Sequence, residues 1–259
     1  MNDHQLPQVL CQLFADGGRG RSLFLTLPEG DVVQSAFWMS DEHVTGEEWT
    51  RFRAEHPRSG LWPVLLDESA QPWESGHFQP DDPALISHFT AEGFMTEVWQ
   101  EWVAQVPVEA LDELDPFGAF CPGLAPPGTL LAAPDAVADW CAGELAKRGT
   151  PLGLAAATRG ADALAVMGWQ GALHHNEWMV PLAAVVRSWE ERFGARVVGM
   201  GFNTLDLSVA GPPTDLGHAL HVAAEHWAFC PDNIVQGAGD LKGYAEQIVD
   251  SHHWSFWWD

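Results

Sequence analysis

The sequence predicts an α+β fold, and three patterns carry this prediction. Small and bulky side chains alternate along residues 152–157, as in a strand with one smooth face. Residues 196–202 and 205–210 form two strands joined at Asn203-Thr204, which is the pattern of a hairpin. With a last strand at 253–258 and helices between them, these strands follow the β-α-β-β-α-β order of a ferredoxin-like split βαβ domain.

Two long helices are expected in this domain because apolar side chains recur at helical spacing. The first lies near residues 181–193, and the second begins after the capping residue Thr214 and ends at Pro231. In such a layer the helices cover one face of the sheet, so the opposite face is predicted to be open. That face would carry mostly small side chains: Gly153, Ala155, Ala157, Gly199, Gly201, Asp206 and Ser208. We expect the amino-terminal unit, a second copy of the chain or a ligand to cover it, in that order.

The amino-terminal half is predicted to be an α/β unit packed against this domain. Residues 22–27 alternate like a half-buried strand, and Thr45 with Glu48 forms a capping box that begins a helix. Residues 61–66 are predicted to form a strand at an edge or a bulge, because Pro63 cannot donate to the ladder.

Prolines and glycines are frequent between residues 107 and 133, which is typical of a boundary between units. The predicted division is therefore an amino-terminal unit (1–106), a linker (107–133) and a carboxy-terminal domain (134–259).

The chain is strongly acidic. Its 259 residues include 12 Lys and Arg against 36 Asp and Glu, a formal net charge of −24 at pH 7. A field of this sign repels phosphate groups, so we expect neither nucleic acids nor anionic membranes as partners. The acidity either keeps the protein soluble or attracts a basic partner, such as a cationic toxin domain or a nuclease.

The location expected from the sequence is the cytoplasm. The first residues lack the basic flank and apolar run of a signal peptide, and no stretch approaches the roughly 20 apolar residues of a membrane span. The four cysteines, Cys11, Cys121, Cys141 and Cys230, are far apart and form no C-x-x-C pair. Reduced thiols are expected, without a disulfide scaffold or a structural zinc site.

No cofactor is expected, and a divalent metal is the alternative. His218, His221 and Glu225 lie at i, i+3 and i+7 of one helix, a spacing that could bring two imidazoles and a carboxylate to one ion. The competing interpretation is a solvated helix face, and the H-E-x-x-H pattern of zinc proteases does not occur.

A second candidate set for catalysis comprises Glu225, His226, Cys230 and Asp232. His226 and Cys230 are one helical turn apart, so the imidazole could lower the thiol pKa and make a nucleophile. The alternative is that Cys230, which falls on the apolar stripe, is a small buried hydrophobe and that His226 bonds a carbonyl group.

Small-ligand sites are possible at two places. Arg159, Asp162 and Asn176 are expected at loop ends of the sheet, where polar ligands often bind. Asp206 and Ser208 would lie on the open face. Arg187 and Glu191, at i and i+4, are expected to form an ion pair on their helix.

The last strand is rich in tryptophan. Alternation predicts that Trp254, Phe256 and Trp258 enter the core while Trp257 points to the open face. In a ferredoxin-like order this strand is an edge, and an exposed aromatic edge favours association. Trp254 and Trp257 are therefore candidate partner-binding residues, including for a homodimer.

Several separated motifs resemble one known family. They are residues 60–66 (GLWPVLL), 168–171 (GWQG), 182–195, 225–232 (EHWAFCPD) and 254–259 (WSFWWD). Together they closely resemble domain-of-unknown-function family 4253, well over about residues 150–259 and loosely over the amino-terminal half. The resemblance implies no settled activity and no catalytic residues.

The first functional hypothesis is a non-enzymatic cytoplasmic module that binds a protein partner, as an immunity or accessory factor does. It follows from the charge, the tryptophan-rich edge and the lack of a recognisable catalytic set. The alternatives are a metal-dependent enzyme that uses the His218, His221 and Glu225 cluster, and a sensor of a small ligand.

Overall fold

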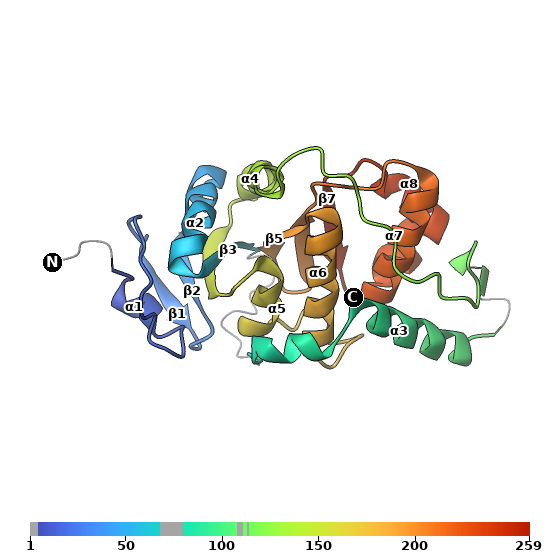
Figure 1. Ribbon diagram of the computed structural model, residues 1–259, viewed down its shortest axis with the longest axis horizontal. Coiled ribbons are helices and arrows are strands. Elements are labelled where there is room, and N and C mark those ends of the chain that lie inside the picture. Colours follow the sequence, from blue (N-terminus) through green and yellow to red (C-terminus); the bar gives the residue numbers. More distant parts are fainter. Residues whose placement is uncertain (1–4, 68–79, 108–110, 113) are drawn as a thin grey trace.

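The computed structural model describes residues 5–67, 80–107, 111–112 and 114–259. In this part of the chain seven strands form one mixed sheet in the order β1-β2-β4-β3-β5-β6-β7 (Figure 1). The strands are β1 (Gly30–Val33), β2 (Phe37–His43), β3 (Leu61–Leu66), β4 (Pro151–Ala156), β5 (Arg196–Met200), β6 (Thr204–Ser208) and β7 (His253–Trp257).

The α-helices are α1 (Gln8–Cys11), α2 (Gly46–Ser59), α3 (Ala91–Gln105), α4 (Pro134–Leu145), α5 (Ala163–Val166), α6 (Val180–Phe193), α7 (Leu216–Phe229) and α8 (Leu241–Ile248). Short 3₁₀ segments are η1 (Pro83–His88), η3 (Ala146–Arg148) and η4 (Gly160–Asp162), and η5 (Asn233–Ala238) is a π-helical turn.

Local signals set several helix ends. The Thr45 hydroxyl accepts from the Glu48 backbone and the Glu48 carboxylate accepts from the Thr45 backbone, which is the predicted capping box of α2. The glycines Gly60 and Gly194 end α2 and α6 in the left-handed region, with φ of 70° and 61°. Near the amino terminus the expectation was wrong: residues 22–27 form no strand, and β1 and β2 follow instead.

The sheet does not have the order of a ferredoxin-like split βαβ domain. Strand β3, from the amino-terminal half, lies between β4 and β5, antiparallel to β4 and parallel to β5. Strand β7 pairs with β6 and not with β4. Pro63 is therefore in a central strand and not at an edge. It is tolerated because the pairing of β3 with β5 begins only at Leu65.

Helices cover both faces of the sheet, so the predicted open face is wrong. One core cluster joins the sheet to α3, α5, α6, α7 and α8, and a second joins it to α1, α2 and α4 (Figure 1). The strand β3 contributes to both clusters, since all six of its residues are buried. Trp62, Val64 and Leu66 enter the first cluster, and Leu61 and Leu65 enter the second.

The small side chains that were expected on one face of the sheet lie on both faces. Ala155 and Ala157 belong to the first cluster, and a Cβ on Gly153 would meet the Leu66 side chain there. A Cβ on Gly199 would instead meet Asp206 and Leu145, on the α4 side of the sheet. The strand β3 lies between β4 and β5, so these two strands do not pair with each other.

Part of the predicted linker is packed against the helices. We call residues 114–128 the strap. The Gly128 backbone donates to the Arg192 carbonyl at 3.0 Å, and Ala125 is buried against α6 and α7. Residues 108–110 and 113 lie outside the described residues. The division into two units stays a prediction, although strands from both sides of the linker share one sheet.

In the described ranges, the helices are too short or too polar to cross a lipid bilayer.

Candidate functional site

Glu225 on α7 is buried and bound from three directions. The Arg192 guanidinium donates to both carboxylate oxygens, Nη1 to Oε1 at 2.8 Å and Nη2 to Oε2 at 2.5 Å. The Trp189 indole donates to Oε2 at 2.9 Å, and the Ala125 backbone of the strap donates to Oε1 at 2.7 Å. Glu225 therefore joins α6, α7 and the strap.

The predicted metal ligands do not converge. Glu225 was expected on a solvated helix face, but it is 2% exposed because the strap covers that side of α7. The Nε2 atom of His218 bonds the Pro126 carbonyl at 2.8 Å, and the His221 ring packs against Phe117. No group of three His, Cys, Asp or Glu side chains within the described residues could hold a metal ion.

His226 lies in an aromatic core. Its Nδ1 is 3.0 Å from the Tyr244 hydroxyl, and its ring is 4.9 Å from both the Trp189 and the Phe256 rings, centroid to centroid. Burial, and then the positive charge of Arg192, hold the pKa of His226 well below its usual value. The imidazole is thus kept neutral and away from solvent.

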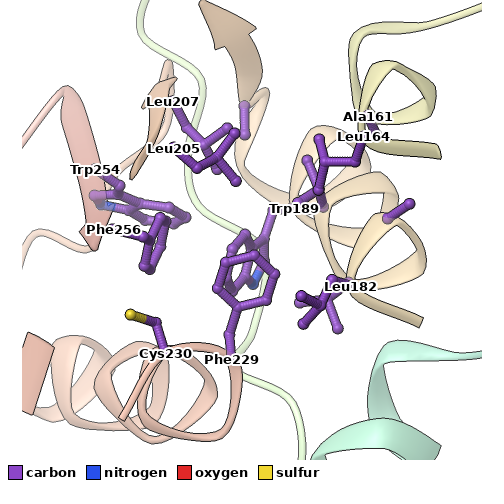
Figure 2. Packing of buried hydrophobic residues seen from close by; sticks show 14 of the residues in the cluster. Ala161, Leu164, Leu182, Trp189, Leu205, Leu207, Phe229, Cys230, Trp254 and Phe256 are labelled. Carbon is purple, nitrogen blue, oxygen red and sulfur yellow. The ribbon is translucent and has the colours of Figure 1, made fainter. Parts of the chain in front are cut away.

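Figure 2 shows the surrounding packing. Trp189 of α6 stacks on Phe256 of β7 at 5.4 Å, and Phe229 of α7 meets the Trp189 ring edge to face at 4.8 Å. Cys230 points into the same core from the end of α7. This part of the chain is a filled interior and not a cleft.

Cys230 does not pair with His226. Its thiol donates to the Trp257 carbonyl at 3.0 Å and contacts the Asn233 amide oxygen at 3.4 Å. Burial raises the pKa of the Cys230 thiol to about 12. This geometry does not support the predicted activation of the thiol by the imidazole and favours the structural alternative for this residue.

Asp232 forms hydrogen bonds that the spacing of residues along the sequence could not indicate. Its Oδ2 bonds His175 Nε2 at 2.9 Å and accepts from the Asp259 backbone at 3.0 Å, and Oδ1 accepts from Gln236 at 2.8 Å. The partners lie 57 and 27 residues from Asp232 in the sequence. Asp232 thus fastens the last residue of the chain and the loop before α6 to the end of α7.

Asn233 covers the outer edge of β7. Its amide nitrogen donates to the Ser255 carbonyl at 2.7 Å, and its amide oxygen accepts from the Trp257 backbone at 3.1 Å. One side chain thereby satisfies the two backbone groups that a neighbouring strand would otherwise bond. β7 does end the sheet, as the sequence predicts, but its edge is occupied at this point.

The aromatic residues of β7 alternate as expected. Trp254, Phe256 and Trp258 are buried, and Trp257 is partly exposed on the opposite face. Trp254, proposed for partner binding, is 1% exposed and packs against Trp189 and Phe193. Its ring is consequently covered by the chain's own helices.

The predicted ligand-binding residues at the loop ends are engaged with other partners. Arg159 pairs with Glu190 and, at 3.0 Å, with Glu191, while Asp162 pairs with Arg187 at 2.7 Å. Arg187 and Glu191 therefore do not form the expected helix pair.

The other predicted ligand-binding residues, Asn176, Asp206 and Ser208, do not take part in these ion pairs. Among the described residues the Asn176 side chain forms no hydrogen bond with Arg159 or Asp162, and its backbone donates to the Ala172 carbonyl at 2.8 Å. Asp206 bonds His253 at 2.8 Å, and Ser208 is fully buried beside it on β6, next to α4. Burial raises the Asp206 pKa, but hydrogen bonds from His253 and Ser255 outweigh it, and the net pKa is lowered.

The sequence carries one signal that motif spacing does not reveal. Residues 59–146 contain 15 Asp and Glu and not one Lys or Arg. Within this stretch lies α3, which buries Met95 and Trp99 and exposes its opposite side. We call that side the acidic face of α3. It borders an open hollow lined by Thr90, Glu92, Gly93, Thr96, Glu97, Gln100 and Glu101.

Among the residues that the structure describes, no cationic side chain pairs with the carboxylates of the acidic face. Glu92, Glu97 and Glu101 are exposed, and no ion pair involves them within the described residues. Glu97 and Glu101 are four residues apart, so their like charges face each other one turn apart on the helix.

Comparison with known proteins finds one match. Residues 151–259 match the family model DUF4253, described as a domain of unknown function. No curated protein and no solved structure matches the chain. The matched segment holds β4 to β7 and α5 to α8, and therefore every residue of the buried polar groups around α7 apart from the strap. The carboxy-terminal part of the chain, residues 151–259, is therefore the part that is similar to the DUF4253 family.

Proposed function

We propose that the protein is a non-enzymatic cytoplasmic module that binds a basic protein partner, such as a cationic toxin domain, through the acidic face of α3. The observation that carries this proposal is the set of exposed carboxylates Glu92, Glu97 and Glu101, which form no ion pair with any described residue and lie in a stretch of 88 residues without Lys or Arg.

The acidic face is electrostatically strained in the free protein. Like charges at i and i+4 destabilise a helix by about 0.2–0.5 kcal/mol, and Glu97 and Glu101 stand in that relation. A cationic partner removes this repulsion on binding. The net charge of −24 adds a long-range field that steers such a partner toward the protein.

The state of the other polar residues supports binding over chemistry. Glu225 is held by Arg192, Cys230 by a backbone carbonyl and Asp232 by three donors. Each of these contacts except the local bond between Asp232 and Gln236 joins separate parts of the fold. The side chains that the sequence offered as catalytic candidates thus hold the fold together. The α3 carboxylates, in contrast, form no ion pair with any described residue.

The α3 helix is well built to present these charges. Trp99 and Trp102 pack edge to face on Trp227 of α7, with ring centroids 5.1 Å and 5.2 Å apart. The Thr90 hydroxyl caps the first turn by accepting from the Gly93 backbone at 3.1 Å. A rigid helix loses little conformational freedom when a partner binds.

A calorimetric titration with hexa-arginine tests the proposal. The triple variant Glu92→Gln, Glu97→Gln, Glu101→Gln should bind about tenfold more weakly than the wild type at low ionic strength, since each exposed pair contributes roughly 0.2–1 kcal/mol. The matched control is Asp31→Asn, Asp41→Asn, Glu42→Gln, which removes the same charge from exposed residues of β1 and β2.

The control should bind within about twofold of the wild type, because its charges lie outside the proposed surface. Equal weakening of both triple variants would mean that net charge alone attracts the peptide and would contradict a site on α3. A wild-type protein that does not bind hexa-arginine at low salt would contradict the proposed function altogether.

A further inference from the structure

A cleft lies between the loop that precedes β1 and the first half of α2. Its volume is about 310 Å³, and its lining residues are Leu25, Thr26, Leu27, Pro28, Glu48, Arg51 and Phe52. Helix α2 belongs to the second core cluster and α3 to the first, so this cleft is separate from the acidic face (Figure 1). We call it the α2 cleft.

Arg51 lines the α2 cleft without a partner of its own. Its side chain is exposed and forms no hydrogen bond, ion pair or cation–π contact with any residue that the structure describes. The chain holds 36 Asp and Glu against 12 Lys and Arg, yet none of the described acids pairs with this arginine. The guanidinium therefore has all its N–H donors available to a ligand in the cleft.

The acids closest to Arg51 on that side of α2 are bound by other groups. Glu48, which also lines the cleft, accepts from the Thr45 backbone at 2.7 Å and from the Thr45 hydroxyl at 2.8 Å. Glu55, one turn after Arg51, pairs with Arg58 at 2.5 Å. Because the negative charge of Glu48 stays in the lining, a ligand with a single negative charge is favoured over a phosphate dianion.

The wall opposite α2 offers backbone groups that are not used by the fold. The backbone of residues 25–28 forms no hydrogen bond within the described part of the chain, and neither does the exposed Thr26 hydroxyl. The side chains of Leu25 and Leu27 pack against the second core cluster, to which the buried Phe52 belongs. The α2 cleft thus combines one cation, free N–H and C=O groups and apolar side chains.

We propose that the α2 cleft binds a carboxylate with an apolar body, the chemistry of a peptide's free C-terminal residue. The planar guanidinium of Arg51 is complementary to a carboxylate, which it can bind through two parallel hydrogen bonds. The free backbone groups of residues 25–28 are complementary to a peptide bond, and the leucine and phenylalanine side chains to an apolar side chain. The ligand is opposite in charge to the basic partner, so this site does not depend on the proposed function.

The test is a titration of acetyl-leucyl-leucine into the wild-type protein, followed by backbone amide shifts in NMR. The free acid should produce saturable changes at residues 25–28 and 48–52, and the same peptide with an amidated C-terminus should bind about fivefold more weakly. Arg51→Gln should weaken binding of the free acid by a similar factor. The matched control is Arg19→Gln, because Arg19 is exposed, forms no ion pair with a described residue and does not line the cleft.

Equal binding of the acid and the amide, or of the acid to the wild type and to Arg51→Gln, would overturn the carboxylate assignment. Equal weakening by Arg19→Gln would do the same, since net charge and not Arg51 would then control the affinity. An absence of saturable changes at residues 25–28 and 48–52 would overturn the cleft as a site.

A second probe distinguishes the two sources of such a carboxylate. Isovalerate has the apolar body and the carboxylate but no peptide bond, so it should bind more weakly than the peptide if residues 25–28 bond a peptide backbone. Equal affinity would instead assign the cleft to a small carboxylic acid. Hexa-arginine should bind Arg51→Gln as it binds the wild type, which keeps a failure at the α2 cleft distinct from a failure at the acidic face of α3.

Discussion

The Arg192 guanidinium binds both carboxylate oxygens of Glu225 inside the helical layer, and this pair is where α6, α7 and the strap meet. Arg192 Nη1 also donates to the Ala125 carbonyl at 2.9 Å, while the Ala125 backbone donates to Glu225. Both ends of the ion pair thus hold the same strap residue. A stretch that the sequence suggests is a linker is thereby tied to the DUF4253 domain.

Breaking this pair should strongly destabilise the protein. Glu225→Gln leaves the shape of the side chain but removes the charge opposite Arg192, and breaking a buried pair costs about 3–5 kcal/mol. Urea unfolding should show a loss of about 3 kcal/mol, while Glu246→Gln on the exposed side of α8 should stay within about 0.5 kcal/mol of the wild type. A loss below about 1 kcal/mol for Glu225→Gln would show that the pair does not hold the strap.

Asn233 should be needed to keep the edge of β7 closed. Asn233→Asp has the same shape but places an acceptor against the Ser255 carbonyl, so one buried bond is replaced by repulsion. We expect a loss of about 2 kcal/mol and concentration-dependent association of the exposed edge in sedimentation. Asn176→Asp is the control. A variant Asn233→Asp that is stable and monomeric would show that the cap is dispensable.

The cysteines should react in two classes. Burial raises the pKa of both Cys141 and Cys230 to about 12, so at pH 8 their thiolate fraction is about 1000-fold smaller than that of an ordinary thiol. Cys11 and Cys121 are partly exposed. Native protein treated with iodoacetamide should be labelled at Cys11 and Cys121 first, as read by mass spectrometry. Early labelling of Cys230 would reinstate it as a candidate nucleophile.

Acid should destabilise the protein through His226. Burial and the charge of Arg192 hold the folded-state pKa of His226 below the unfolded value of 6.5, so the unfolded chain takes up the proton first as pH falls. This contribution to stability is complete above about pH 6.5 and is lost as pH falls toward the folded pKa, by up to about 1.4 kcal/mol per pH unit.

The check is the free energy of unfolding measured between pH 7 and pH 5. The slope in His226→Gln should be smaller than in the wild type by about one proton, whereas His174→Gln, on an exposed loop, should keep the wild-type slope. Equal slopes in the wild type and His226→Gln would contradict a neutral, buried imidazole.

Local chemistry made much of the secondary structure predictable. The capping box at Thr45 and Glu48 and the alternation of Trp254, Phe256 and Trp258 each depend on residues close in sequence, and each is confirmed. The strand order was not predictable in this way. β3 joins β4 across about 90 residues, and no local pattern reports which strand is its neighbour.

The candidate site shows the same limit. Helical spacing placed His218, His221 and Glu225 on one side of α7, which is correct as geometry, but it assumed that this side faces water. The strap covers it, and a cover supplied by residues 114–128 leaves no trace in the spacing of α7. The bond between His175 and Asp232 could not be predicted either, because the two residues lie 57 positions apart in the sequence. The acidic face of α3 could have been found, because the absence of Lys and Arg from residues 59–146 is visible in the sequence.

The most direct test of a binding role is a map of backbone amide shifts by NMR while hexa-arginine is added to the wild-type protein. We predict that the largest changes fall on the acidic face of α3, around Glu92, Glu97 and Glu101. Changes centred on residues 218–232, with α3 unaffected, would contradict this account and return attention to the polar residues of α7.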